Sequence, residues 1–383
     1  MATRSGLRWN CWPDDTDHLL LTAVSHADSA VALGAWRASR DSVLAPTQEQ
    51  RRLFGQLAGR VAVLDPIDPF LADLQGVART IRAENLQHLM NIESVMAMLE
   101  QAGSEAVVLK GTALLLSVYE NLSLRLIADV DVWVHPARHA EALAVFEAAG
   151  LTRDQRDLMG LHAIGLSGGP IPVDVHRAIN QELVAPGLAD NGWGFFERVE
   201  SPKALPSGRH ITTLASADAL VHTIVHGLSW NGPVALRWVT DSVQLIRSGT
   251  VDLDRVVMLA DRLAIAPVVH DALRYVDEVA GGLVDTKLFT QLAACRTSGL
   301  GELRLRAFHE RPEHEGEPPP MGFTLSRFLQ RTKGDTPLRS IGHLPELLRD
   351  QYHADGWFDL VRRISGTALV RIGQRLAGRP SES

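Results

Sequence analysis

The sequence predicts an α+β fold: a small mixed sheet flanked by N-terminal and C-terminal helical regions, mostly helical overall. Apolar residues recur at helical spacing up to residue 104, short apolar runs separated by turns follow, and helical spacing returns from residue 216. We therefore expect an N-terminal helical region over 1–104, an α/β core over 105–215 and a C-terminal helical region over 216–383.

The composition is that of an ordinary globular protein. Of the 383 residues, 45% are hydrophobic and 22% are charged, and the formal net charge is −7. This acidic balance disfavours broad, non-specific binding of nucleic acid. The two cysteines, Cys11 and Cys295, do not indicate a disulfide framework. No apolar run approaches the roughly 20 residues of a membrane helix, and Met1–Asp14 lacks a secretory segment. We expect a cytoplasmic protein without a membrane partner.

The first region should contain three helical stretches, because its apolar residues lie three and four positions apart. The Pro66–Pro69 turn separates the second stretch from a long third helix. The expected stretches are Leu19–Leu33, Gln48–Val63 and Phe70–Ala102.

The second region should alternate short strands and helices. Buried strands are expected where apolar residues run between turn residues, and Gly150 should end a helix. The expected order is a strand at 106–109, a turn at 110–112, a helix at 113–119, a strand at 126–134, a helix at 135–149, and paired strands at 161–166 and 171–176.

Helices should return in the third region. They are expected at 218–228 and 235–246, with two more within 253–279 and a loop at 314–320. The tail, 357–376, has the pattern of an amphipathic helix with spread arginines. Such a helix can lie on a membrane or on nucleic acid, but a solvated helix face is the favoured interpretation.

Asp129 and Asp131 are the first candidate functional residues. In a strand, side chains two positions apart point to the same face, and apolar neighbours such as Val130 and Val132 indicate that this strand is buried. Two adjacent buried carboxylates repel each other, and a divalent cation removes that cost. Oxygen ligands favour Mg²⁺ or Mn²⁺ over Zn²⁺. Taken alone, however, this pair is better explained as a solvated strand end or a helix cap.

Two neighbouring motifs change that balance. Lys110-Gly111-Thr112 lies where a strand meets a helix, and a helix N-terminus offers free N–H groups to phosphate. Downstream, Asp174 and His176 share a face of another predicted strand. Asp174 adds a third carboxylate, whereas His176 is equally well explained as a partner of Asp174 or as an ordinary strand residue.

In this order, the motifs resemble the polymerase-beta-type nucleotidyltransferase superfamily and, more closely, its uncharacterised bacterial nucleotidyltransferase family. The resemblance covers about residues 75–250. The matching positions are Leu109-Lys110-Gly111, Arg125, Asp129-Val130-Asp131, Val173-Asp174-Val175-His176, Leu220-Val221-His222, His226 and Arg237-Trp238-Val239-Thr240-Asp241. The sequence has Gly111-Thr112 where the superfamily usually has Gly-Gly or Gly-Ser.

The resemblance implies metal-dependent transfer of a nucleoside monophosphate from an NTP such as ATP to an acceptor, with release of pyrophosphate. The acceptor would be a small molecule, a peptide or a protein. Mg²⁺ or Mn²⁺ would be held by the catalytic residues Asp129, Asp131 and Asp174, the last of which would alternatively act as a base.

The resemblance also implies that the nucleotide phosphates are bound by Lys110, Gly111, Thr112 and Arg125. His222 and His226 lie one helical turn apart, which is also a zinc-ligand spacing, but a structural or acceptor-site role is favoured for both. Two other functions remain open: a catalytically silent nucleotide-binding interaction module, and a toxin-like enzyme that modifies tRNA. Three retained carboxylates argue against the first, and the net acidity argues against the second.

Overall fold

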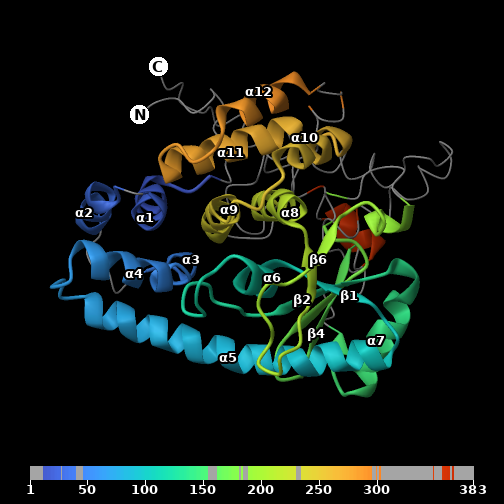
Figure 1. Cartoon of the computed structure of the whole chain (residues 1–383). Helices are drawn as coiled ribbons and strands as arrows, with labels where there is room; N and C mark the ends of the chain where they lie inside the picture. The colour runs from blue at the N-terminus through green and yellow to red at the C-terminus, as the bar shows by residue number, and fades with distance from the viewer. Residues whose placement is uncertain are drawn as a thin grey trace.

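The computed structural model describes residues 12–26, 28–39, 46–153, 162–180, 189–229, 234–295 and 356–362, with single residues at 183, 299, 302, 348 and 365. Figure 1 shows a central sheet, with the long helix α5 (Leu71–Gln101) at the bottom of the view and the C-terminal helices at the top. The predicted α+β fold, with helices on both sides of a mixed sheet, is confirmed.

The described strands form one seven-stranded mixed sheet in the order β3-β4-β5-β2-β1-β7-β6. The pairs β2–β5 and β1–β7 are parallel, and the other neighbours are antiparallel. The strands are β1 (Ala106–Val108), β2 (Val130–Val134), β3 (Thr152–Arg153), β4 (Ala163–Ser167), β5 (Val173–His176), β6 (Arg198–Glu200) and β7 (Thr212–Leu214).

The strands differ from the predicted ones in length and number. β2 begins at Val130, so the predicted strand from residue 126 is wrong in its first part. The strands β3, β6 and β7 were not predicted, because segments of two or three residues carry too little alternation to be recognised. The predicted pairing of β4 with β5 is confirmed, and Gly168 supplies a left-handed residue, with φ of 92°, in the turn between them.

The N-terminal helices begin at residues that cap them. The Asp14 side chain accepts a hydrogen bond from the Asp17 N–H, and Thr47 and Gln50 form a reciprocal capping box. The apolar stretch expected at Leu19–Leu33 is divided into two helices, since the backbone at His26 is extended. The helices are α1 (Asp15–Ser25), α2 (Ala30–Ala38), α3 (Gln48–Arg51), α4 (Phe54–Leu64) and α5.

Two helices and a short 3-10 turn connect the first strands of the sheet. They are α6 (Lys110–Ser117), η1 (Pro136–Arg138) and α7 (His139–Ala148), and a second 3-10 segment, η4, spans Ala189–Gly192. The prediction of a turn at 110–112 is wrong, because α6 already begins at Lys110. Lys110 itself has a left-handed backbone, and for this reason the strand can pass directly into the helix without a separate loop.

The C-terminal helices are α8 (Ser216–Leu228), α9 (Arg237–Arg247), α10 (Leu253–Arg262), α11 (Ala266–Ala280) and α12 (Thr286–Ala294). A Cβ atom at Gly227 would lie 2.2 Å from the Trp238 Cβ, so α8 and α9 pack closely at a glycine. Buried residues from all three predicted regions, such as Leu20, Val132 and Leu259, belong to one contiguous hydrophobic core. The three regions therefore share their core.

Some predicted features lie outside the described residues: the loop at 314–320, Leu161 and most of the arginine-bearing tail helix beyond Arg362. The short described part of that tail includes the exposed side chains Trp357 and Phe358. Within the described residues, none of the helices has the length and apolarity needed to cross a membrane.

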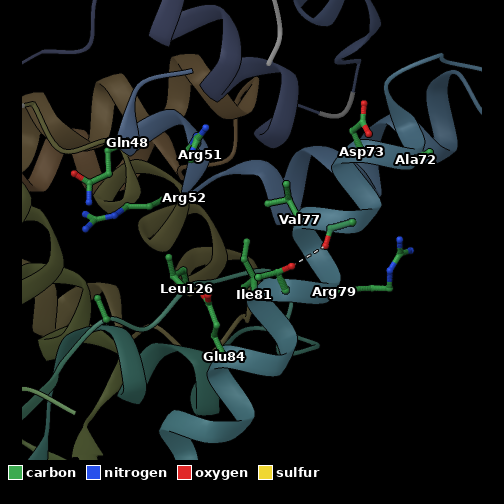
Figure 2. Close-up of a pocket in the computed structure, with 13 residues that line it drawn as sticks. Gln48, Arg51, Arg52, Ala72, Asp73, Val77, Arg79, Ile81, Glu84 and Leu126 are labelled. Atoms are coloured by element: carbon green, nitrogen blue, oxygen red, sulfur yellow. Dashed lines mark hydrogen bonds between the residues drawn. The ribbon is translucent and has the colours of Figure 1, made fainter. Parts of the chain in front are cut away.

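A cavity of about 810 Å³ lies between α3, α5 and the chain segment that leads into β2 (Figure 2). Arg51 and Arg52 line it from α3 and the residue after it, and Val77 lines it from α5. Leu126 and Ala128 line it from the segment that leads into β2. Because Asp129 follows Ala128 in the chain, the cavity adjoins the predicted metal site.

Candidate functional site

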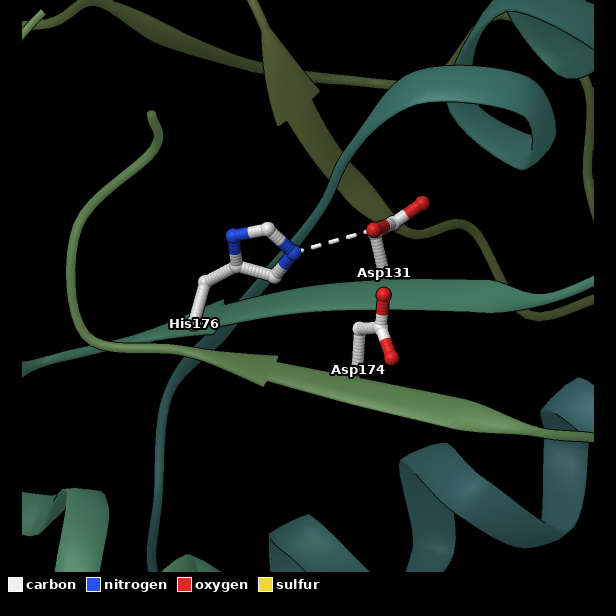
Figure 3. Close-up of side chains that lie close together, drawn as sticks. All are labelled: Asp131, Asp174 and His176. Atoms are coloured by element: carbon white, nitrogen blue, oxygen red, sulfur yellow. Dashed lines mark hydrogen bonds and ion pairs between the residues drawn. The ribbon is translucent and has the colours of Figure 1, made fainter. Parts of the chain in front are cut away.

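The pairing of β2 with β5 brings two of the predicted carboxylates together. In this parallel register Asp131 lies opposite Asp174, and Trp133 lies opposite His176. Residues opposite each other in neighbouring strands point to the same face of the sheet, and so do residues two positions apart. Ligand atoms of Asp131, Asp174 and His176 consequently lie within 4.8 Å of one another. Figure 3 shows the three side chains close together above the two strands.

Asp131 is the buried carboxylate of this Asp131–Asp174–His176 cluster, with 2% of its side chain exposed. Its Oδ1 lies 2.5 Å from the Lys110 Nζ and 2.9 Å from the His176 Nε2. Burial alone would raise the pKa of Asp131, but the ammonium of Lys110 and the His176 hydrogen bond outweigh it and hold the pKa well below its ordinary value. Asp131 is therefore an anion over the whole physiological pH range.

Asp174 has the opposite electrostatic character. Burial and the neighbouring charge of Asp131 raise the pKa of Asp174 to about 6, against the smaller opposing effect of Lys110. The charge of Asp131 thus disfavours a second negative charge on Asp174, and a cation between the two carboxylates would relieve that repulsion.

Asp129 stands apart from this cluster. It precedes β2, is exposed to solvent, and does not join Asp131, Asp174 and His176 within the 4.8 Å grouping. Partial desolvation and the charge of Asp131 raise the pKa of Asp129, so the two groups still repel each other. The sequence reasoning placed both residues in one strand, whereas only Asp131 lies in it.

The start of α6 faces the same carboxylates through Lys110. That residue has a φ of 49°, a left-handed conformation that costs a non-glycine residue about 1–2 kcal/mol. Leu109 supplies no side-chain cap, and the buried hydroxyl of Thr112 has no hydrogen-bond partner among the described residues. The helix N-terminus and the Thr112 hydroxyl thus retain hydrogen-bonding capacity for a phosphate group.

Arg125 occupies a different environment from the one predicted for a phosphate-binding arginine. It is 6% exposed, and its Nε and Nη2 atoms donate to the Asp241 carboxylate over 2.8 and 3.0 Å. Its Nη1 donates to the Leu126 carbonyl over 2.9 Å, and Tyr119 donates its hydroxyl to Asp241 over 2.6 Å. Arg125 therefore joins the core to α9 in this structure.

The packing of Arg125 also explains Gly111. A Cβ atom at that position would lie 2.9 Å from the Arg125 Nη1, so a larger residue would displace the guanidinium. On the other side, the buried amide of Asn85 in α5 holds the same segment: it donates to the carbonyls of Leu122 and Arg125 and accepts from the Ile127 N–H. Residues of α5, α6 and α9 thus position the chain segment that leads to Asp129 and Asp131.

Two histidines of α8 lie near the cluster, His222 buried and His226 half-buried. Burial, and then the positive charge of Lys110, lower the pKa of His222 to about 3 and hold the pKa of His226 well below its ordinary value. Both are neutral at pH 7. The Nε2 atom of His222 has no hydrogen-bond partner within the described part of the chain. These residues are consistent with the structural or acceptor-site role expected from the sequence.

The residues of the cluster fit a divalent cation. Two carboxylates and an imidazole nitrogen offer converging ligand atoms, and the mutual repulsion that raises the pKa of Asp174 would be relieved by a bound cation. The imidazole nitrogen suits Mn²⁺ better than Mg²⁺, whose preferred ligands are oxygens. The sequence identified all three residues, but it explained His176 equally well as a partner of Asp174 or as an ordinary strand residue, because its contact with Asp131 depends on strand register.

Other neighbours of the site were not recognised from the sequence. Arg51 and Arg52 line the cavity beside the segment before Asp129, and they come from α3 and the residue after it. No spacing in the sequence links residues so far apart, so only the fold reveals this group.

A family described as uncharacterised nucleotidyltransferase matches residues 42–281, more than half of the chain. The crystal structure of an antigenic nucleotidyltransferase-like protein from Paracoccidioides brasiliensis is 12% identical, covers 57% of this chain and 96% of its own, and gives a TM-score of 0.34. No curated protein matches the sequence. On the strength of the family match, the chain belongs to the uncharacterised nucleotidyltransferase family.

Proposed function

We propose that this protein transfers a nucleoside monophosphate from an NTP to an acceptor in a reaction that depends on Mg²⁺ or Mn²⁺. The observation that carries the proposal is the side-by-side arrangement of Asp131 and Asp174 on neighbouring parallel strands, next to the start of α6. A buried carboxylate beside a half-buried one is costly for folding, and a bound cation would offset that cost. Family membership supports nucleotidyl transfer as the chemistry.

In this reaction an acceptor oxygen or comparable nucleophile forms a bond to the α-phosphorus, the bond from that phosphorus to the bridging oxygen breaks, and pyrophosphate leaves. Asp131, Asp174 and His176 would hold the cation, with Asp129 joining them when the nucleotide is bound. The cation would neutralise the triphosphate and polarise the α-phosphorus. Asp174 would share the cation or take the proton of an attacking hydroxyl.

The phosphates would lie at the start of α6. The free N–H groups of Gly111 and Thr112 and the Thr112 hydroxyl would donate to phosphate oxygens. Lys110 would exchange its contact with Asp131 for one with the triphosphate, which keeps both charges balanced. Arg125 would act as a positioning residue, because its N–H donors already engage Asp241 and Leu126.

The test uses the full chain with each α-³²P-labelled NTP, with Mg²⁺ or Mn²⁺, and with panels of small molecules, peptides and proteins as acceptors. Transferred label with matching pyrophosphate release is the expected result. Binding of Mn²⁺ and of a fluorescent NTP analogue is measured in parallel, because these readouts need no acceptor.

Asp131→Asn should abolish transfer and weaken Mn²⁺ binding by at least about tenfold, because even the loss of a group that only supports a metal ligand typically lowers metal affinity by that much. Asp28→Asn, at an exposed carboxylate between α1 and α2, is the matched control and should behave as wild type. Wild type that binds no metal–NTP, or an Asp131→Asn variant that binds it as tightly as wild type, would refute the proposal.

A further inference from the structure

The cavity shown in Figure 2 carries arginines on one wall and borders the chain segment that leads to Asp129. Arg51 and Arg52 line it together with Val77 and Ile81 of α5, and Leu126 and Ala128, which precede Asp129 in the chain, line it as well. The cavity therefore combines apolar surface with guanidinium groups, one residue away in the chain from a candidate metal ligand.

Guanidinium groups also meet around Leu126. Arg125 donates to its carbonyl over 2.9 Å, and Arg237 approaches the same oxygen at 3.4 Å from α9. Arg52 lines the cavity together with Leu126. The guanidinium groups of Arg52, Arg125 and Arg237, from three separate parts of the chain, thus lie around Leu126.

The carboxylates near these arginines do not balance all of them. Asp241 pairs with Arg125, and Glu49 pairs with Arg52 over 2.5 Å. Among the residues that the structure describes, Arg237 forms no ion pair with a carboxylate, and the one hydrogen bond of its guanidinium is the long contact with the Leu126 carbonyl. One half-buried guanidinium therefore lacks a counter-ion.

That arrangement is electrostatically costly. Burial, followed by the charges of Arg125 and Arg52, lowers the pKa of Arg237 to about 10, against weaker opposing effects of Asp241 and Glu49. Removing a charge from water without a partner costs free energy, and a bound anion recovers it. The acidic residues Asp73 and Glu84 also line the cavity but do not pair with Arg237, so they leave this cost in place.

We propose that this cavity is an anion site that binds a phosphate group of a ligand, held by Arg51 and Arg52. Arg237, which contacts the lining residue Leu126, would add positive charge behind it. Guanidinium groups match phosphate geometry well, and the apolar wall of α5 would contact the remainder of the ligand. The phosphate belongs either to the NTP or to an acceptor that carries one. The proposal concerns binding and stands whether or not the protein catalyses transfer.

The experiment measures binding of inorganic phosphate and of tripolyphosphate to the full chain by calorimetry, in EDTA so that no metal bridges the ligand to Asp131. Wild type should bind tripolyphosphate more tightly than phosphate, because more oxygens reach the arginines. Arg237→Met and Arg51→Met should each weaken binding about tenfold or more, which is the effect of losing hydrogen bonds to a charged group. Arg82→Met, at an exposed arginine of α5 outside the cavity, is the control.

A second arm identifies the source of the phosphate. If a non-hydrolysable ATP analogue with Mg²⁺ displaces tripolyphosphate, the site holds nucleotide phosphates; if both bind together, it holds an acceptor phosphate. Arg51 is exposed and carries no ion pair within the described part of the chain, so Arg51→Met keeps the test usable should Arg237→Met fail to fold. Absence of tripolyphosphate binding to wild type, or equal binding by Arg51→Met and Arg82→Met, would overturn the proposal.

Discussion

The ion pair between Arg125 and Asp241 can be tested by removing the charge of Asp241 while keeping its shape. Both residues are buried, with 6% and 3% exposed, and the carboxylate accepts two hydrogen bonds from Arg125 and one from Tyr119. In Asp241→Asn the guanidinium stays buried without a counter-ion. Breaking a buried pair in this way typically destabilises a protein by about 3–5 kcal/mol.

We expect the lower end of that range, about 3 kcal/mol, because the asparagine oxygen still accepts one hydrogen bond. With an unfolding entropy of about 2.1 cal/mol/K per residue, the 383-residue chain would have an entropy of about 0.8 kcal/mol/K, and the midpoint of thermal unfolding would fall by about 4 °C. Urea unfolding followed by tryptophan fluorescence measures the free energy, and circular dichroism measures the midpoint.

The double variant Arg125→Met/Asp241→Leu is the decisive control. It removes both charges together, so it should be more stable than the single variant Arg125→Met, in which the Asp241 charge stays buried. An Asp241→Asn variant within about 1 kcal/mol of wild type would refute the reasoning. So would a double variant whose loss of stability equals the sum of the losses measured for Arg125→Met and Asp241→Leu separately.

Three further outcomes follow from other parts of the site. Lowering the pH from 6.5 should destabilise the protein by about 1.4 kcal/mol per pH unit through His222 alone; its folded pKa of about 3 lies below its unfolded value, so the unfolded chain binds the proton first. His222→Gln should therefore give a shallower fall in urea-unfolding free energy between pH 6.5 and 5, and an unchanged slope would contradict this. Gly227→Ala should destabilise the α8–α9 contact by about 1–3 kcal/mol, because the added methyl group overlaps Trp238, and a thermal midpoint equal to that of wild type would count against it. Lys110→Met should bind Mn²⁺ more tightly than wild type in the absence of nucleotide, since the ammonium no longer competes for the Asp131 oxygen; electron paramagnetic resonance of free Mn²⁺ measures this, and weaker binding would disprove it.

Local patterns in the sequence predicted much of the fold. Helix α5 was expected at 70–102 and spans Leu71–Gln101, because its 31 residues repeat the helical period many times. The pairing of β4 with β5 was predictable from the glycine turn between two apolar runs. Strands of two or three residues carry no comparable signal, and this is why β3, β6 and β7 were missed.

The candidate site was predictable in its residue types and less so in its geometry. Asp131 and Asp174 were expected together and lie opposite each other, but the proximity of His176 to Asp131 depends on the register of two strands. The partner of Arg125 lies 116 positions away, a separation for which a single sequence contains no spacing rule. The family resemblance implied that Arg125 binds phosphate, whereas in the structure a buried carboxylate on α9 engages it.

The hydrogen bonds of Asn85 have a consequence for how the protein can be divided. One amide in α5 holds the carbonyls of Leu122 and Arg125 and the N–H of Ile127, so the loop before the carboxylates takes its shape from the N-terminal region. The segment 105–215, expressed alone or placed in another protein, would lack the Asn85 hydrogen bonds that shape this loop. Exchange of parts between related chains should preserve function only when α5, this loop and α9 are inherited together.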